Sequence, residues 1–546
     1  MPKPASTSPK VGIDWPPECG GKTTGIAKSV WAACAKAGGR DDLAAAIEAE
    51  KNWRFGYAPH VRQIAELLAG DRVLDVCKAG LDAMSQNLVF RSSSGDGAGT
   101  VETLAALSAA APASSSAQEY FDTKIVKGEG AFSAKKSGEN GGGFSVPYKG
   151  KNLAGADLAD QLRQWADYGT CEADCVPKIE RAAQDLGPLK DRWFVLLGAG
   201  SELGPLKPLL EQGARVVAVR TRREKEWDKM EAFAKTTPGT LYVPTRAGAR
   251  GADILTEPVQ IRDWVLGVIT AASVESQSKT PAVADNTVTV GMYTYLDAEA
   301  HVRVTMGCDL IMNGLLQTLT ANKTPVRLAY LCTNSMPLPI NRSAFDAIEE
   351  NRARAPLAVQ WSGCERNPVS LVARGGGGAD TEGGEDNKVH AIYHCIFEAQ
   401  GPNYVLAKFL QLFRALLANN ESAGGDKKGG SGTSSASLNV APACYTESVT
   451  HAPTMKYLLN AMHLIPPQEA FQPETARALM FLLLAWDCGC GRNQGPTAGA
   501  ASGNSPLALA LTGSFHGGSL RAGFNIEKSK LLSTMMYMYG RFWAPN

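Results

Sequence analysis

The chain has 546 residues, with 55 Lys and Arg against 54 Asp and Glu, a formal net charge of +1 and 44% hydrophobic residues. This length predicts several domains, and the hydrophobic content is too high for a largely disordered chain. The balanced charge excludes a bulk field that would attract nucleic acid or an anionic membrane. No apolar run reaches the roughly 20 residues that cross a bilayer, so we expect a soluble protein without a membrane span.

The first ten residues, MPKPASTSPK, contain no apolar signal core, so we do not expect secretion. The same segment is free of acidic residues, which leaves an organelle such as a plastid, reached after removal of a transit peptide, as the alternative to a cytoplasmic location. The 12 cysteines are not spaced as a disulfide framework or a zinc site. We therefore expect reduced thiols and no metal.

Residues 1–185 carry apolar positions at three-to-four spacing between charges, which predicts a mostly helical region with Gly/Ser-rich linkers. A different sequence pattern follows over residues 186–450, where short apolar runs alternate with helical stretches. Polar, glycine-rich stretches near 337–387 and 420–434 interrupt this alternation and are predicted to be surface insertions. Residues 451–546 are predicted to form a helical extension, which would serve as a substrate lid or a docking surface.

The apolar runs of the middle region are predicted to be strands. Strands that alternate with helices favour right-handed crossovers, so the expected fold class is α/β, with a doubly wound parallel sheet. The predicted strands are Trp193–Leu197, Arg215–Val219, Thr240–Val243, Thr287–Gly291, Val326–Cys332 and Ser437–Val440.

A glycine-rich turn follows the first predicted strand and opens a helix. It contains Gly198, Gly200, Ser201 and Gly204. Gly198 allows a tight turn, Gly200 lets the backbone approach a pyrophosphate, and Gly204 permits close packing of helix on strand. The pattern predicts a dinucleotide site in a Rossmann fold; the alternative is an ordinary glycine turn between a strand and a helix.

The end of the second predicted strand indicates which dinucleotide is bound. An acidic residue commonly stands there to accept hydrogen bonds from the ribose of NAD. This chain has Arg220-Thr-Arg222-Arg223 instead, and guanidinium groups suit a 2′-phosphate. We therefore expect NADP(H) as cofactor, bound through Arg220 and Arg222; the alternative is that these charges are the solvated start of a helix.

Tyr404 and Lys408 lie four residues apart in an apolar helical pattern, which puts the phenol and the ammonium on one face. A neighbouring ammonium lowers the pKa of a phenol and makes it a usable proton donor or acceptor. The pair follows a predicted strand that ends in Thr333 and Ser335, whose hydroxyls would meet a substrate carbonyl. Tyr120 and Lys124 have the same spacing but precede the glycine turn.

In this order of features the sequence resembles the short-chain dehydrogenase/reductase superfamily, from about residue 193 to residue 450. The resemblance implies that Tyr404 is the catalytic acid or base and that Lys408 lowers its pKa and holds the ribose. It also implies that Ser335, with Thr333 as second choice, polarises the carbonyl. The remaining implied positions are Asn313 as a proton-relay residue, and Pro442 and Thr446 in the loop beside the nicotinamide.

The sequence departs from the pattern of that superfamily at three places. The turn is GxGxxxG rather than TGxxxGxG, and Val290-Gly291-Met292 stands where Asn-Ala-Gly is usual; we assign Gly291 to the cofactor site. The separation of Ser335 from Tyr404 is long, which is the reason for predicting the insertion at 337–387. Near the C-terminus, His516-Gly-Gly is interpreted as a turn, or as a cap over the substrate pocket.

The predicted function is that of an NADP(H)-dependent oxidoreductase, either a carbonyl reductase or an alcohol dehydrogenase, with a small-molecule carbonyl substrate. The alternative is a catalytically degenerate structural or scaffold subunit, which keeps the nucleotide fold and uses both ends of the chain for docking. The chain is longer than a minimal reductase needs, which favours that alternative. Homo-oligomers and larger protein complexes are both compatible with the sequence.

Overall fold

A computed structural model of the chain describes residues 11–92, 100–110, 120–132, 143–277, 287–361, 369–373, 389–423, 434–451, 453–490, 509, 514–525 and 530–543. The predicted insertion near 420–434 lies largely outside these residues, as do 362–368 and 374–388 of the predicted insertion at 337–387. No helix in the described ranges is long and apolar enough to cross a membrane.

An eight-stranded sheet forms the centre of the molecule. Its parallel strands follow the spatial order β9-β8-β7-β11-β12-β16, so the chain runs outward from β7 to one edge and then returns to build the other half from β11. Their bounds are Trp193–Leu197 for β7, Arg215–Val219 for β8, Thr240–Arg246 for β9, Val288–Met292 for β11, Val326–Thr333 for β12 and Ser434–Ala441 for β16.

The predicted purely parallel sheet is wrong at one edge. There β9 pairs in the antiparallel sense with β4 (Asp122–Lys127) and with the two-residue β10 (Ala249–Arg250). The outer backbone groups of β9 need hydrogen-bond partners, and these two segments provide them. Because β4 comes from the region predicted to be mostly helical, residues 1–185 also contribute to the central sheet.

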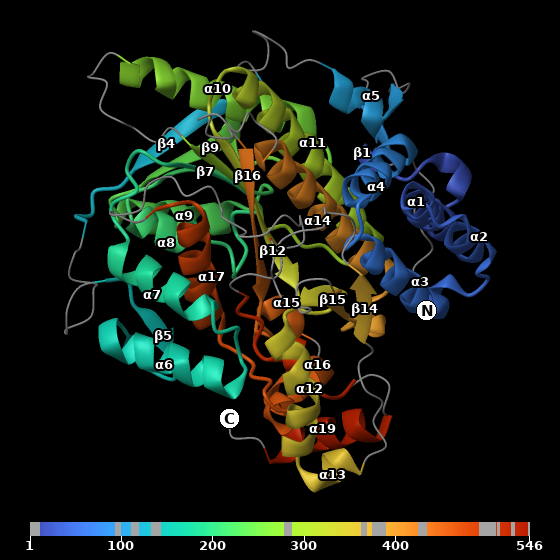
Figure 1. Cartoon of the computed structure of the whole chain (residues 1–546). Coiled ribbons are helices and arrows are strands. Elements are labelled where there is room, and N and C mark those ends of the chain that lie inside the picture. Colours follow the sequence, from blue (N-terminus) through green and yellow to red (C-terminus); the bar gives the residue numbers. More distant parts are fainter. Residues whose placement is uncertain are drawn as a thin grey trace, which may run out of the picture.

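Helices cover both faces of the sheet (Figure 1). Along β7, the side chains of Trp193, Val195 and Leu197 face one core, and those of Phe194 and Leu196 face another. The first core is closed by α10 (Pro258–Gln277), α11 (Glu299–Ala321) and α14 (Pro402–Ala423); the second is closed by α8 (Leu206–Glu211), α9 (Glu224–Lys235) and α17 (Pro473–Asp487). Successive strand residues point to opposite faces, so a strand buried on both sides is apolar throughout.

The N-terminal helices pack outside the first layer. α1 (Thr24–Ala37) and α4 (Val73–Asn87) lie against α14, and the ring of Trp31 meets that of Phe409 edge to face at 5.1 Å. The other elements of this part are β1 (Gly12–Asp14), α2 (Asp41–Ala49), α3 (Trp53–Leu67), β2 (Val89–Arg91), β3 (Val101–Thr103) and α5 (Leu104–Ala109).

The other layer continues with β5 (Val146–Tyr148), β6 (Lys151–Leu153), α6 (Gly155–Tyr168) and α7 (Cys175–Asp185), which adjoin α17. The first part of the predicted insertion at 337–387 is not a polar surface loop, because Leu338, Ile340 and Ala344 are buried in the main core. It forms β13 (Leu338–Ile340), α12 (Arg342–Arg354), α13 (Leu357–Gln360) and β14 (Val369–Ala373), and β13 and β14 both pair with β15 (Val389–Tyr393).

The C-terminal elements gather around α12. Figure 1 shows α12, α13, α16 and α19 together at the lower end of the molecule, below the sheet. Their shared core contains Val359, Ile465, Phe524 and Met536. The bounds are Glu447–Thr450 for α15, Pro453–Asn460 for α16 and Lys530–Phe542 for α19. Residues 451–546 are therefore packed against the rest of the chain wherever they are described.

Candidate functional site

The predicted site residues mostly lie at the carboxyl end of the parallel strands, because such ends share one edge of a sheet. The glycine turn follows β7, and the segment containing Thr333 and Ser335 follows β12. Two contacts join them. A Cβ built on Gly198 would lie 2.8 Å from Thr294 N, and the neighbouring Tyr295 ring lies 6.3 Å from that of Tyr404. The segment that follows β11 therefore lies between the turn and the phenol.

The turn after β7 has the backbone that its glycines predict. Gly198 adopts φ +87°, a left-handed value that favours glycine, and its N–H donates to Val219 O at 3.0 Å. Ser201 N donates to Gly198 O at 3.0 Å, and Gly204 N donates in turn to Ser201 O at 3.1 Å. This pair of hydrogen bonds closes the loop before α8 begins at Leu206.

Arg220 lies directly over this turn. A Cβ on Gly200 would come within 1.9 Å of Arg220 Nη1, so only glycine leaves room for the guanidinium there. Burial lowers the pKa of Arg220, an effect that the charge of Glu226, 3.8 Å away, partly offsets. A partly buried guanidinium at a glycine turn can receive an anionic group of a ligand.

Arg222 has a different role. Its guanidinium donates to the buried Glu257 carboxylate at 2.6 Å, and Tyr120 OH donates to the same carboxylate at 3.1 Å. Arg246 stands 3.9 Å from that carboxylate. The structure therefore brings Arg220, but not Arg222, to the turn. It also puts Tyr120 in a separate polar cluster, away from Tyr404.

Tyr404 and Lys408 share one face of α14, as their spacing predicts. The ammonium lies 5.9 Å from the centre of the phenol ring and donates to Leu331 O at 3.2 Å and to Gln411 Oε1 at 3.3 Å. Burial lowers the pKa of Lys408. The expectation that Lys408 lowers the pKa of Tyr404 is wrong for the ligand-free protein, because burial raises this pKa and the nearby hydroxyl of Thr333 only partly offsets the rise. Without a ligand the phenol is therefore a proton donor in its neutral form.

The two hydroxyls expected at the end of β12 meet each other and the phenol. Thr333 Oγ1 and Ser335 Oγ are 3.0 Å apart, and Ser335 Oγ donates to Gln400 Oε1 at 2.5 Å. Hydrogen bonds from both hydroxyls counteract the raised pKa of Tyr404. Tyr404, Lys408, Thr333 and Ser335 thus form one cluster.

Two residues of this cluster were not predicted. His301, in the first turn of α11, stacks on Tyr404 with ring centres 5.6 Å apart and planes inclined by 18°. Tyr295 lies 5.2 Å from the His301 ring and is 49% exposed. A signal was available in the sequence, because Tyr293-Thr-Tyr295 follows β11 directly and strand ends on this edge carry ligand contacts.

The other predicted residues are placed as follows. Asn313 Oδ1 accepts from Arg414 at 2.9 Å, and the same guanidinium forms two hydrogen bonds with Asp309. Arg414 is ten residues from Tyr404 along α14, a rise of about 15 Å, so the structure does not bring Asn313 to the phenol. Gly291 lies under the ring of Tyr293, because a Cβ there would be 2.4 Å from that ring.

The loop after β16 lies beside the glycine turn. Thr446 is buried and its hydroxyl lies 3.1 Å from Ser448 Oγ, while Glu447 N donates to the carboxylate of Glu202 at 2.7 Å. A small hollow adjoins this loop and has space for about one water molecule. Leu203 of the turn, Asn439 of β16 and Phe481 of α17 line it, with other residues.

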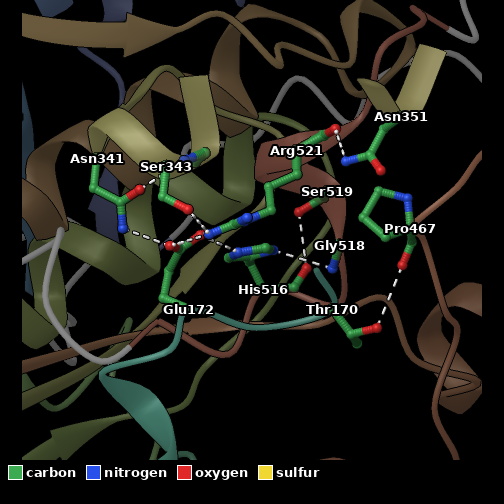
Figure 2. A network of polar contacts seen from close by, with 11 residues as sticks. Thr170, Glu172, Asn341, Ser343, Asn351, Pro467, His516, Gly518, Ser519 and Arg521 are labelled. Atoms are coloured by element: carbon green, nitrogen blue, oxygen red, sulfur yellow. Dashed lines mark hydrogen bonds and ion pairs between the residues drawn. The ribbon is translucent and has the colours of Figure 1, made fainter. Parts of the chain in front are cut away.

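A buried ionic network surrounds the carboxylate of Glu172 (Figure 2). The Glu172 carboxylate accepts from Arg521 Nε at 3.0 Å and from Arg521 Nη2 at 2.8 Å. His516 Nε2 lies 2.9 Å from it, and Asn341 Nδ2 donates to it as well. Gly518 N donates to His516 Nδ1 at 3.0 Å, which leaves the imidazole proton on Nε2. Burial raises the pKa of Glu172, but the hydrogen bonds from His516 and Arg521 outweigh it and hold that pKa well below its usual range.

Residues 514–521, the C-terminal strap, connect this network to the predicted nicotinamide loop. Gly517 adopts φ +66°, and a Cβ on it would be 2.9 Å from Pro442 Cβ. Gly518 adopts φ +80° and passes so close to Pro467 O that a Cβ would be 2.2 Å away. His516-Gly-Gly is therefore a turn whose imidazole faces Glu172.

Within the described ranges, no three His, Cys, Asp or Glu side chains are grouped so that they could hold a metal ion. No protein-family model matches the sequence, and no curated protein matches it either.

Proposed function

We propose that this chain is an NADP(H)-dependent oxidoreductase of the short-chain dehydrogenase/reductase type, acting on a carbonyl or alcohol substrate. The observation that carries the proposal is the convergence of Tyr404, Lys408, Thr333 and Ser335 on the sheet edge that also bears the Gly198 turn. The parallel strand order supports it, because 3-2-1-4-5-6 is the order of Rossmann dinucleotide-binding folds. Ligands of such sheets bind where that order reverses, here between β7 and β11.

The residues present fit the cofactor. The backbone at Gly200 has no Cβ where Arg220 approaches, and the Arg220 guanidinium over the turn can pair with a 2′-phosphate. Gly198, Gly200 and Ser201 would hold the diphosphate and Arg220 the 2′-phosphate, with Lys408 on the ribose. When bound, the nicotinamide supplies or accepts a hydride.

The side chains of the site would handle the oxygen of the substrate. Thr333 would donate a hydrogen bond to the carbonyl oxygen, and Ser335 would do so once its hydroxyl turns away from Gln400 Oε1. Tyr404 delivers a proton to the same oxygen as the alcohol forms. The Lys408 ammonium stabilises the phenolate that remains. In the reverse direction the phenolate removes the alcohol proton.

Cofactor binding is tested by fluorescence titration with NADPH and NADH. We expect NADPH to bind more tightly than NADH. Arg220→Ala should lower the ratio of the two affinities at least tenfold, because one hydrogen bond to a charged group contributes about that factor. Arg215→Ala is the matched control, because Arg215 begins the strand that Arg220 follows. Equal, millimolar affinity for both nucleotides in the wild type would refute the cofactor assignment.

Catalysis is tested by NADPH consumption with a panel of ketones and aldehydes. Tyr404→Phe should lower turnover by about 10²–10⁴-fold, the usual contribution of a general acid. Tyr120→Phe is the control: it has the same Tyr-x-x-x-Lys spacing, but its phenol binds Glu257 elsewhere. Unchanged turnover in Tyr404→Phe would show that Tyr404 is not the general acid.

A second candidate is a scaffold subunit with a silent nucleotide fold. It is favoured by the raised pKa of Tyr404 and by the small hollow between the turn and α17. A wild-type chain that binds NADPH but reduces no compound of the panel would support this candidate over the enzyme.

A further inference from the structure

His301 is the least satisfied polar group of the candidate site. Its side chain is only 1% exposed, it stacks on Tyr404, and the tilted Tyr295 ring contacts both of these rings. The Nδ1 atom accepts a long hydrogen bond from Leu296 N at 3.5 Å. Among the residues that the structure describes, none forms a hydrogen bond with Nε2.

The position of the imidazole proton follows from these contacts. Burial and the Lys408 charge lower the pKa of His301 to about 3, so the ring is neutral. Because Nδ1 accepts from the backbone, the proton is on Nε2. A buried N–H without an acceptor costs free energy, so its place beside Tyr404 indicates an oxygen that a bound compound brings.

The neighbouring donors differ from His301, because they have acceptors within the chain. The Lys408 ammonium donates to Leu331 O and Gln411 Oε1, and Ser335 Oγ donates to Gln400 Oε1. The hydroxyls and the phenol suffice for the oxygen that is reduced. His301 Nε2–H is then left for a second oxygen.

We propose that His301 is a specificity-determining residue whose Nε2–H donates to a second acceptor oxygen of the substrate, next to the reacting carbonyl. The favoured substrate class is therefore a carbonyl compound with an adjacent oxygen, such as a 1,2-dicarbonyl, rather than a simple ketone. This inference rests on the proposed reductase function. Tyr295, half exposed beside the imidazole, is the side chain that we expect to shift to admit that oxygen.

The test compares 2,3-butanedione with 2-butanone in NADPH consumption by the full chain. His301→Phe keeps a flat ring against Tyr404 but removes both nitrogens. We expect the ratio of kcat/KM for butanedione to kcat/KM for butanone to fall about tenfold, the effect of one hydrogen bond. His301→Gln retains a donor and should recover part of the loss for butanedione alone.

The control is His463→Phe, because His463 also contacts a tyrosine ring, that of Tyr539 at 5.4 Å, but lies on the C-terminal helices away from the sheet edge. It should change neither rate. An equal loss for both substrates in His301→Phe would show packing alone and overturn the inference while the reductase function stands. A wild type that binds no NADPH and reduces neither compound overturns both.

Discussion

The Glu172 network offers the sharpest test of how the C-terminal strap is held. Replacing Glu172 with Gln removes one negative charge and keeps the shape of the side chain. Arg521 would then lie buried, at 8% exposure, without the carboxylate that forms two hydrogen bonds with it. Its remaining acceptors would be neutral: the amide oxygen of the introduced glutamine and Ser343 Oγ, which accepts from Arg521 at 3.1 Å.

The expected cost is large because the pair is buried. Removing one partner of a buried ion pair destabilises a protein by about 3–5 kcal/mol, since the remaining charge is left uncompensated. This is a sizeable part of the roughly 5–15 kcal/mol that separates folded from unfolded protein. Asp346→Asn is the control: its pair with Arg342, on the neighbouring α12, is exposed, and such pairs contribute about 0–1 kcal/mol.

Denaturant unfolding of both variants and the wild type measures the difference. The lowered pKa of Glu172 also sets a pH dependence, because its stabilising effect is complete above the unfolded value near 4.3 and is lost as pH falls toward the folded value. The difference in the free energy of unfolding between wild type and Glu172→Gln should therefore become smaller below about pH 4. A gap under about 1 kcal/mol at pH 7 would refute the assignment of Glu172 as the charge that holds the strap.

Three further predictions concern the sheet edge. Gly198→Ala should lower the free energy of unfolding by about 1–3 kcal/mol, because a Cβ at φ +87° is strained and would meet Thr294 N at 2.8 Å; thermal unfolding measures it, and an unchanged midpoint contradicts it. Ala298→Gly should instead stabilise by about 1 kcal/mol, since Ala298 has φ +53° without a glycine's freedom; a lower midpoint in the same assay would count against this. The raised pKa of Tyr404 predicts that its phenolate forms above the usual pH of about 10 in the ligand-free protein, seen as the difference in tyrosinate absorbance between wild type and Tyr404→Phe; a difference that appears at lower pH contradicts the burial argument.

The strands of the central sheet could be predicted because their signal is local. Trp193–Leu197 and Arg215–Val219 are predicted with the bounds that the structure has, since strands buried on both faces are continuous apolar runs between turns. β4 could not be found in this way. Its sequence DTKIVK is polar and mostly exposed, and only pairing with β9, far along the chain, makes it a strand.

Some residues of the candidate site could likewise be predicted from local sequence patterns, and others could not. Tyr404 and Lys408 follow from helical spacing, and Thr333 and Ser335 from the end of a strand. The spacing of residues in the sequence does not predict the direction in which a polar or charged side chain points. Arg222 pairs with Glu257, 35 positions later, and Asn313 binds Arg414 of another helix. Such partners are chosen by tertiary packing, which has no local pattern in the sequence.

The span of the Glu172 network has a consequence for biosynthesis. Glu172 and Arg521 are 349 positions apart, so the carboxylate leaves the ribosome long before its cation exists. At about 5–20 residues per second, that delay is roughly 20–70 s. During this interval Glu172 has no Arg521 to pair with, so this network forms only after residue 521 has been translated.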